Sequence, residues 1–170
     1  LSGGMKQRVV IGISVSNKPK LIIADEPTTA LDVSVQAQIL KLLLDLRKKY
    51  DTTVMLITHN LGVVAEVSDR VLVMYAGRVA EIADVYSLFG EPLHPYTIGL
   101  LKAVPNPLKR IERIEPIPGS VPDMINVPSG CRFHPRCPKA MDICKREQPP
   151  LVQIRGGRSV ACWLYAEKNS

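Results

Sequence analysis

The stretch that decides the fold is LIIADEPTTALD, residues 21–32, in which an apolar run ends in two adjacent carboxylates and a proline. Residues 21–24 show no alternation of apolar and polar side chains, which predicts a strand covered on both faces, as in a parallel α/β sheet. Pro27 then ends the strand. In such sheets ligands bind beyond the carboxyl ends of the strands, where Asp25 and Glu26 emerge. The sequence therefore predicts an α/β fold with a ligand site at this edge.

Asp25 and Glu26 are neighbours on the predicted strand, so their side chains should point to opposite sides and have different roles. Such a pair suits phosphoryl transfer, in which one carboxylate holds Mg²⁺, directly or through water, and the other polarises the attacking water. We expect Asp25 to be the magnesium ligand and Glu26 the catalytic base. An isolated Asp-Glu pair is also compatible with two acids that merely face water, so the neighbouring motifs decide.

A second candidate for phosphate binding lies in residues 1–5, which read LSGGM and precede a run with apolar residues at helical spacing. Ser2 is therefore a plausible N-cap. Gly3 and Gly4 would leave backbone N–H groups free to approach an anion, and the helix dipole would add to the attraction. Taken alone, the Ser-Gly-Gly triplet is explained more simply as an ordinary turn before a helix.

Residues 53–58 form a second apolar run, which predicts another buried strand that ends at His59. The intervening residues 33–50 predict an amphipathic helix with a basic last turn. Because one helix connects the two strands, the right-handed crossover rule favours adjacent parallel strands and brings His59 beside Glu26. A single histidine after a strand is more often structural than catalytic, but this position makes a phosphate contact credible.

The following residues predict a short helix, a hairpin and a helix capped by Asp84, at residues 61–68, 70–82 and 85–89. The composition then changes, because 12 of the 14 prolines lie between Pro92 and Pro150. Only residues 98–103 keep a helical pattern, and the remainder as far as Gly130 is expected to be extended and loop-rich. We therefore expect two domains, residues 1–90 and residues 91–170.

Three motifs occur together in the first domain: LSGGMKQR at residues 1–8, ADEP at residues 24–27 and ALD at residues 30–32. Their order and spacing resemble the second half of an ABC-type nucleotide-binding domain, which has the α/β fold of P-loop NTPases. Two positions depart from the family pattern. Met5 replaces the glutamine that is commonest in the first motif, and Asn60 replaces an acid that often follows the histidine of the second strand.

The resemblance implies roles for residues that the pattern of apolar and polar residues does not assign. Ser2, Gly3 and Gly4 would contact the γ-phosphate of an ATP molecule bound mainly to the opposite subunit, so that a working site needs two such domains. Asp32 would lie in the loop that crosses the dimer interface. His59 would be the switch histidine of the family, in contact with the γ-phosphate.

The second domain contains all the cysteines of the chain, in the spacing C-x5-C-x6-C-x17-C, at positions Cys131, Cys137, Cys144 and Cys162. Four thiols beside a cytosolic-type ATPase argue for a soft metal or cluster rather than disulfides. Zinc sites usually include a close C-x2-4-C pair, whereas this wider spacing suits the four corners of a [4Fe-4S] cluster somewhat better. Zn²⁺ and four free thiols remain the alternatives.

The second domain also narrows the resemblance. EPLHPYTIGLL at residues 91–101, a proline-rich stretch and CRFHPRCP at residues 131–138 resemble the C-terminal extension of ATP-binding subunits of oligopeptide and dipeptide permeases. Members with this cysteine pattern are associated with a [4Fe-4S] cluster, and the resemblance implies the same ligands here. It also implies that the chain works with a paralogous or identical ATPase subunit, two transmembrane permease subunits and an extracytoplasmic solute-binding protein.

The resulting hypothesis is an ATPase, with ATP and Mg²⁺ as cofactors, that drives peptide import from the cytoplasmic face of the cell membrane. No stretch approaches about 18 uninterrupted apolar residues, so we expect nothing in the sequence to span a membrane, and the resemblance implies peripheral association. A nickel or other solute importer of the same family is the alternative, and a soluble ABC ATPase acting on nucleic acid or ribosomes is a second. The sequence lacks a GxxxxGK[ST] loop and begins inside a motif, so we expect a fragment that is inactive alone.

The formal net charge of +6 does not favour a nucleic-acid partner. Residues 131–170 contain eight Lys and Arg against three Asp and Glu, so most of the excess belongs to this segment. A basic face with interleaved stacking aromatics is not evident in the sequence. We therefore expect no nucleic-acid partner.

Overall fold

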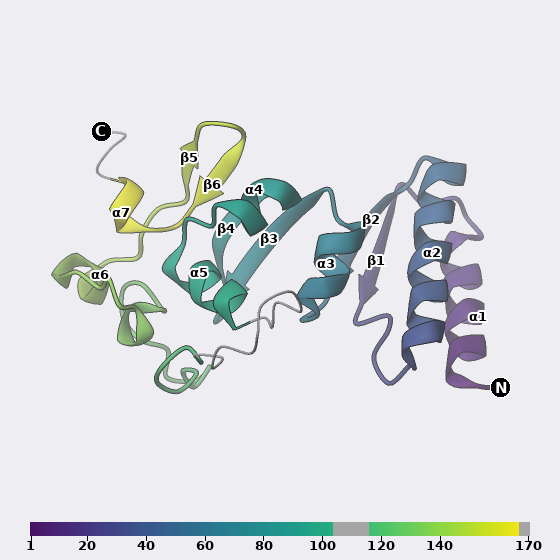
Figure 1. Cartoon of the computed structure of the whole chain (residues 1–170), viewed down its shortest axis with the longest axis horizontal. Coiled ribbons are helices and arrows are strands. Elements are labelled where there is room, and N and C mark those ends of the chain that lie inside the picture. Colours follow the sequence, from purple (N-terminus) through teal and green to yellow (C-terminus); the bar gives the residue numbers. More distant parts are fainter. Residues whose placement is uncertain (104–115, 167–170) are drawn as a thin grey trace, which may run out of the picture. The chain divides into compact units, whose positions relative to one another are not determined.

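The fold is described from a computed structural model, in which residues 1–103 and 116–166 are described (Figure 1). The chain consists of two compact units, Leu1–Val67 and Ser68–Ser170. Among the described residues, no helix combines the length and the apolar character that crossing a bilayer requires.

The first unit alternates helices and strands, in the order expected from the sequence. Its elements are α1 (Gly3–Val15), β1 (Leu21–Asp25), α2 (Val33–Tyr50), β2 (Thr53–Ile57) and α3 (Leu61–Val67). Figure 1 shows α1 and α2 side by side next to β1. Strands β1 and β2 pair in parallel, with Leu21 opposite Thr53 and Asp25 opposite Ile57. The predicted parallel α/β arrangement is therefore confirmed in this unit.

Strand β1 is covered on one face and not on both, contrary to the sequence-based expectation. Ile22 and Ala24 are buried, and Ala24 packs in a core with Ile11, Ile39 and Leu43 from α1 and α2. The alternate residues are exposed, with Ile23 at 60%. The physical reason is that this core, built with both helices, covers a single side of the strand. A continuous apolar run shows that both faces tolerate burial, and within this unit helices α1 and α2 pack on one of them.

The second unit contains a four-stranded sheet that joins distant parts of the sequence. Its elements are β3 (Arg70–Tyr75), β4 (Arg78–Asp84), α4 (Val85–Gly90), α5 (Pro95–Lys102), η1 (His134–Arg136), α6 (Asp142–Arg146), β5 (Val152–Ile154), β6 (Arg158–Val160) and α7 (Trp163–Ala166). The strand order is β3-β4-β6-β5, with antiparallel neighbours. Figure 1 shows the β5–β6 hairpin beside the β3–β4 hairpin.

The β3–β4 hairpin and the helix after it agree with their sequence signals. Ala76 and Gly77 both have positive φ angles, 46° and 76°, as in the two-residue turns that connect the strands of a hairpin. Asp84 caps α4, because its carboxylate accepts a hydrogen bond from the Ser87 N–H at 3.0 Å. These local signals positioned both elements correctly.

The compact units divide between Val67 and Ser68, ahead of the boundary expected near Gly90. Pairing of β4 with β6 explains the difference, because Ile82 lies opposite Ser159 and ties the first hairpin to the end of the chain. The described residues 116–130 contain no helix or strand, as expected, whereas the expectation for residues 104–115 lies outside the described part.

Candidate functional site

Glu26 lies in a tight turn immediately after β1. Its φ angle is 44°, in the left-handed region, and its backbone N–H donates a hydrogen bond to the carbonyl of Ile57 at 2.9 Å. A glutamate in this region is uncommon, and such backbone strain concentrates at functional sites. This hydrogen bond therefore attaches the backbone of Glu26 to the end of β2, and the chain continues from there to His59.

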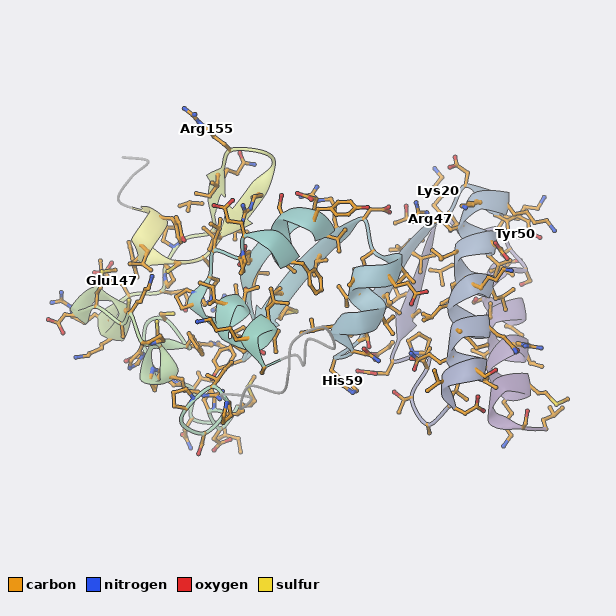
Figure 2. All side chains as sticks on the ribbon, in the orientation of Figure 1. Lys20, Arg47, Tyr50, His59, Glu147 and Arg155 are labelled. Atoms are coloured by element: carbon orange, nitrogen blue, oxygen red, sulfur yellow. The ribbon has the colours of Figure 1, made fainter. Side chains whose placement is uncertain are left out.

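The Glu26 carboxylate accepts hydrogen bonds from two side chains. Oε1 lies 2.7 Å from Nδ1 of His59, and Oε2 accepts a hydrogen bond from the Thr29 hydroxyl at 3.0 Å. The His59 hydrogen bond, with help from Thr29, holds the pKa of Glu26 below its ordinary value. Figure 2 shows the His59 side chain extending away from the ribbon at the start of α3. The arrangement favours an ionised carboxylate that is fixed in position but open to solvent.

The sequence predicted that His59 lies beside Glu26, but it did not predict the hydrogen bond from Thr29. The threonine lies three residues after Glu26, in the turn Pro27–Ala30, and the left-handed conformation of Glu26 allows the chain to fold back. Threonine is common in turns that have no functional role, so the sequence alone does not identify Thr29 as a site residue. Its role depends on a φ angle that sequence reasoning does not predict.

Asp25 and Asp32 occupy different places on the same unit. Asp25 is the last residue of β1, directly precedes Glu26 and is exposed. Asp32 is the N-cap of α2, because its Oδ1 accepts a hydrogen bond from the Val35 N–H at 2.8 Å. The structure therefore gives Asp32 a local capping role, which the sequence motif did not predict.

The Ser-Gly-Gly motif begins α1 as expected. Ser2 is the N-cap, and its hydroxyl oxygen accepts a hydrogen bond from the Met5 N–H at 3.3 Å. Gly4 is buried, and a Cβ atom there would lie 2.5 Å from Val35 Cγ1, which is too close for any side chain. Gly4 is thus required for packing of α1 on α2, in addition to any phosphate contact.

A second candidate site is a small cavity in the second unit that all four cysteines line. The lining includes Cys131, Cys137, Cys144 and Cys162 together with His94, Phe133, His134, Met141 and Trp163. All four cysteines are free thiols. The backbone N–H of Cys131 donates to the carbonyl of Cys144 at 2.8 Å, which joins two of the four cysteine positions. The topology therefore brings together thiols that are up to 31 positions apart in the sequence.

For three of these thiols, Cys131, Cys137 and Cys162, burial favours the protonated form. Burial raises the pKa of Cys131 and Cys137 above the ordinary value, and it raises the pKa of Cys162 to about 11. The other cysteines add to the shift, since thiolates so close together would repel one another. Four thiolates would therefore need a compensating cation in this cavity. Residues 1–103 and 116–166 contain no group of three or more ligands arranged for a single metal ion.

Sequence reasoning missed His94, His134 and Trp163 in the lining of this cavity. His94 is buried, caps α5 through its Nδ1, which accepts a hydrogen bond from the Tyr96 N–H at 3.0 Å, and has its ring 5.8 Å from that of Phe133. Burial lowers the pKa of His94 to about 4. Its position beside a proline on a presumed surface segment gave no signal of burial.

Two family descriptions match the chain. Residues 80–144 match the family described as "Oligopeptide/dipeptide transporter, C-terminal region", and residues 1–29 match the family described as "ABC transporter". The first match begins at residue 80, ahead of the expected domain boundary near Gly90, and the second covers the first two of the three motifs in the first domain. Neither description mentions zinc or an iron–sulfur cluster, so the metal prediction for the cysteines is not supported by them.

Curated relatives resemble the chain over its whole length. The oligopeptide transport ATP-binding protein AppD of Bacillus subtilis (strain 168) is 58% identical over 170 residues, which cover 100% of this chain and 52% of that protein. The oligopeptide transport ATP-binding protein OppD of Salmonella typhimurium (strain LT2) is 51% identical over 167 residues, which cover 98% of this chain and 50% of that protein. The chain thus spans about half the length of these relatives.

A solved structure confirms the fold class. A metal-chelate type ABC transporter in an inward-facing conformation aligns with 59% of this chain and 38% of its own chain, with a TM-score of 0.51 and 30% identity. The sequence-based expectation of an ABC-type α/β fold is therefore correct. From one end to the other, the chain is a homologue of the ATP-binding proteins of oligopeptide and dipeptide ABC transporters.

Proposed function

We propose that this chain supplies the hydrolytic half of an ATP-binding subunit that powers peptide import. The observation that carries this proposal is the Glu26 carboxylate, which His59 and Thr29 hold at the carboxyl ends of two parallel strands. Ligands of parallel sheets bind at that edge. The names of the relatives, which are oligopeptide transport ATP-binding proteins, support the same function.

In the proposed reaction, Glu26 is the catalytic base. A water molecule attacks the γ-phosphorus of ATP, its proton passes to the Glu26 carboxylate, and the bond between the γ-phosphorus and the β,γ-bridging oxygen breaks to release ADP and phosphate. The lowered pKa keeps Glu26 ionised and ready to accept that proton. His59, whose side chain is 85% exposed, keeps the carboxylate in place through Nδ1 and presents its other ring nitrogen to the γ-phosphate.

Asp25 is the proposed magnesium ligand. It ends β1, is exposed and directly precedes the Glu26 turn, and a carboxylate is the type of ligand that Mg²⁺ accepts beside nucleotide phosphates. When bound, Mg²⁺ would neutralise charge on the β- and γ-phosphates. The separate positions of Asp25 and Glu26 suit the two different roles proposed from the sequence.

The Ser-Gly-Gly motif is proposed to act on ATP held by a second ATPase subunit, identical or paralogous. Ser2, Gly3 and Gly4 form the N-terminus of a helix of 13 residues, where backbone N–H groups and the helix dipole favour an anion. Asp32 would contribute to the same interface from the start of α2. ATP would close two such subunits against each other, and hydrolysis would reopen them.

The motion is proposed to drive two transmembrane permease subunits, with the ATPase pair bound peripherally at the cytoplasmic face of the membrane. An extracytoplasmic solute-binding protein would deliver the cargo. Peptides are favoured as cargo because residues 80–144 match the oligopeptide/dipeptide transporter region. Nickel or another solute remains the alternative cargo, since other subunits select it.

We further propose that the four-cysteine cavity binds a [4Fe-4S] cluster. The cysteines fit this group because all four are free thiols that line one cavity, and the irons of a cluster would balance the negative charge of the thiolates that bind it. A single Zn²⁺ holds four sulfur atoms about 2.3 Å from the metal, whereas a cluster binds each thiolate to a different iron and accepts a wider spacing. The absence of a compact ligand group among the described residues therefore weighs against zinc more than against the cluster.

Glu26→Gln tests the proposed hydrolysis in the complete ATP-binding protein assembled with its transporter. The amide cannot accept the proton of water, so turnover should fall by roughly 10² or more while ATP binding stays nearly intact. Glu66→Gln, which changes an exposed glutamate of α3, is the matched control and should keep normal turnover. Near-normal steady-state ATPase activity of Glu26→Gln would contradict the role of Glu26 as base.

A further inference from the structure

Glu81 is a carboxylate with no exposed surface in the middle of β4. Its side chain is 0% exposed and is among the largest fully buried side chains of the chain. A buried carboxylate is costly unless it is paired and hydrogen-bonded, so its partners show what it holds. Glu81 itself does not line the four-cysteine cavity. It binds the backbone of His94, which lines the cavity, and the side chain of Arg158, which lies on the strand that leads to Cys162.

The first group is the backbone of Leu93 and His94. The Leu93 N–H donates to both carboxylate oxygens, at 3.0 and 3.1 Å, and the His94 N–H donates to Oε2 at 2.9 Å. His94 lines the four-cysteine cavity, with its side chain buried at the start of α5. Glu81 therefore fixes the backbone from which one wall of the cavity projects.

The second group is the Arg158 guanidinium. Nη2 of Arg158 lies 3.4 Å from Oε1 of Glu81, and the arginine side chain is only 9% exposed. The same nitrogen also donates to the carbonyl of Glu91, and Nη1 lies 3.6 Å from Oε2 of Glu91. Arg158 is the first residue of β6, so the ion pair fixes the start of this strand against β4.

Strand β6 leads directly into Cys162. Glu81 and Val160 are paired across the two strands, and the Ala161 N–H donates to the carbonyl of Ala80 at 2.9 Å. Cys162 follows at the wall of the cavity. It is the cysteine most distant in sequence from the others, and the β4–β6 pairing places the residues that lead into it.

We propose that Glu81 is the positioning residue of the four-cysteine cavity, because one buried carboxylate holds both the His94 backbone and the strand that delivers Cys162. Its effect on metal loading rests on the proposed cluster, whereas its effect on the position of Cys162 does not. A buried ion pair that merely stabilises the second unit would loosen all four cysteines together. A positioning role makes Cys162 respond selectively.

Thiol alkylation of the metal-free chain provides the first test. Glu81→Gln keeps the size of the side chain but loses the charge that pairs with Arg158. The alkylation rate of Cys162, measured by mass spectrometry, should rise at least about tenfold, and that of Cys137 less than about twofold, because the lost ion pair holds the start of β6, the strand that leads into Cys162. Glu91→Gln, at an 83% exposed carboxylate that faces the same arginine, is the matched control and should change neither rate.

Anaerobic reconstitution with Fe²⁺ and sulfide provides the second test. Glu81→Gln should bind less than about half of the iron that the unaltered chain binds, and Glu91→Gln should bind the same amount. If the unaltered chain binds no iron while Cys162 is still selectively exposed in Glu81→Gln, the proposed cluster fails and the positioning role stands. Equal rates for Cys162 in both proteins, or an equal rise at all four cysteines, would overturn the positioning role.

Arg158→Lys keeps the experiment decisive if Glu81→Gln does not fold. Lysine retains the positive charge beside Glu81 but lacks the planar fork that reaches both Glu81 and Glu91. The same selective rise in Cys162 alkylation is expected, with circular dichroism as the check that the chain is folded. An unchanged Cys162 rate in folded Arg158→Lys would contradict the proposal.

Discussion

Nδ1 of His59 lies 2.7 Å from Oε1 of Glu26, although 33 positions separate the two residues in the sequence. Parallel pairing of β1 with β2 brings the two residues together, because Asp25 lies opposite Ile57, Glu26 directly follows Asp25, and His59 lies two residues after Ile57. The Thr29 hydroxyl holds the second oxygen of the same carboxylate. Glu26 and its two hydrogen-bond partners thus come together where the two adjacent strands end.

Thr29→Val should impair the proposed base without removing it. The change deletes the hydrogen bond to Oε2, which favours the ionised carboxylate, so the pKa of Glu26 should rise and the acid limb of the pH–rate profile should move to higher pH. A lost hydrogen bond to a charged group corresponds to roughly a 10-fold decrease in turnover. Steady-state ATPase measurements across pH provide the check. Thr29→Ser keeps the hydroxyl and should restore both properties, whereas an unchanged profile for Thr29→Val would exclude the positioning role.

Two substitutions of Asp32 separate its capping role from its proposed role at a subunit interface. Asp32→Ala removes the acceptor for the Val35 N–H and should lower the free energy of unfolding by about 1 kcal/mol. Asp32→Asn keeps a good N-cap, so its free energy of unfolding should stay within a few tenths of a kcal/mol of that of the unaltered chain. Urea denaturation measures both.

The interface role of Asp32 then depends on the asparagine variant. If the carboxylate acts across a dimer, Asp32→Asn should lower ATPase turnover of the assembled transporter while the chain remains as stable as before. Turnover that falls only in Asp32→Ala, in step with its stability, would reduce Asp32 to a helix cap.

Local signals in the sequence predicted most of the first unit. The bounds of α2 follow from the apolar stripe and its basic last turn, and parallel pairing of β1 and β2 follows from the single connecting helix. Adjacent positions of Glu26 and His59 follow from that topology. The hydroxyl of Thr29 does not, because it depends on the left-handed turn at Glu26.

The second unit was predicted less well, because long-range pairing determines it. Strands β5 and β6 have only three residues each, too few for a periodic pattern, and β6 is fixed by β4, which lies far away in sequence. The burial of Glu81 has the same origin, since its partner Arg158 lies 77 positions away. The four cysteines were recognised from their composition and spacing, but the histidines beside them had no such signal.

His94 should make the second unit acid-sensitive in the metal-free chain. Burial lowers its pKa from 6.5 to about 4, so the unfolded chain binds a proton at this position that the folded chain does not. The contribution of His94 to the free energy of unfolding is therefore fully present above pH 6.5. It falls as the pH decreases from 6.5 towards 4, and the loss reaches about 3 kcal/mol at pH 4. Urea denaturation at a series of pH values measures this loss.

His94→Asn is the matched variant for this pH dependence. Asparagine is a good N-cap and can accept the hydrogen bond from the Tyr96 N–H, but it does not titrate. The stability of the variant should depend less on pH between 6.5 and 4 than that of the unaltered chain. Identical slopes in the two proteins would show that His94 is not the source of the acid sensitivity.

The last prediction concerns the proposed [4Fe-4S] cluster. The helices and strands within residues 116–166 have at most five residues each, so metal binding should supply much of the folding free energy of this segment. Protein purified without oxygen should be brown and contain iron and sulfide. Replacing any one of the four cysteines by serine should bleach the thiolate-to-iron absorption and make this segment protease-sensitive. The first unit should stay folded, because its core lies in α1, β1 and α2.

Each outcome of that experiment has a distinct meaning for the cavity. Ser14→Ala, a change in α1 remote in sequence from the cysteines, is the control and should leave colour and protease resistance unchanged. Stoichiometric zinc without iron would exclude the cluster but keep a metal that cross-links the segment. Four thiols that are freely alkylated while the segment resists protease would exclude both metals. In that case the packing of Phe133 against Tyr75 and Tyr96, at ring distances of 5.1 and 5.4 Å, would be what holds the cavity together.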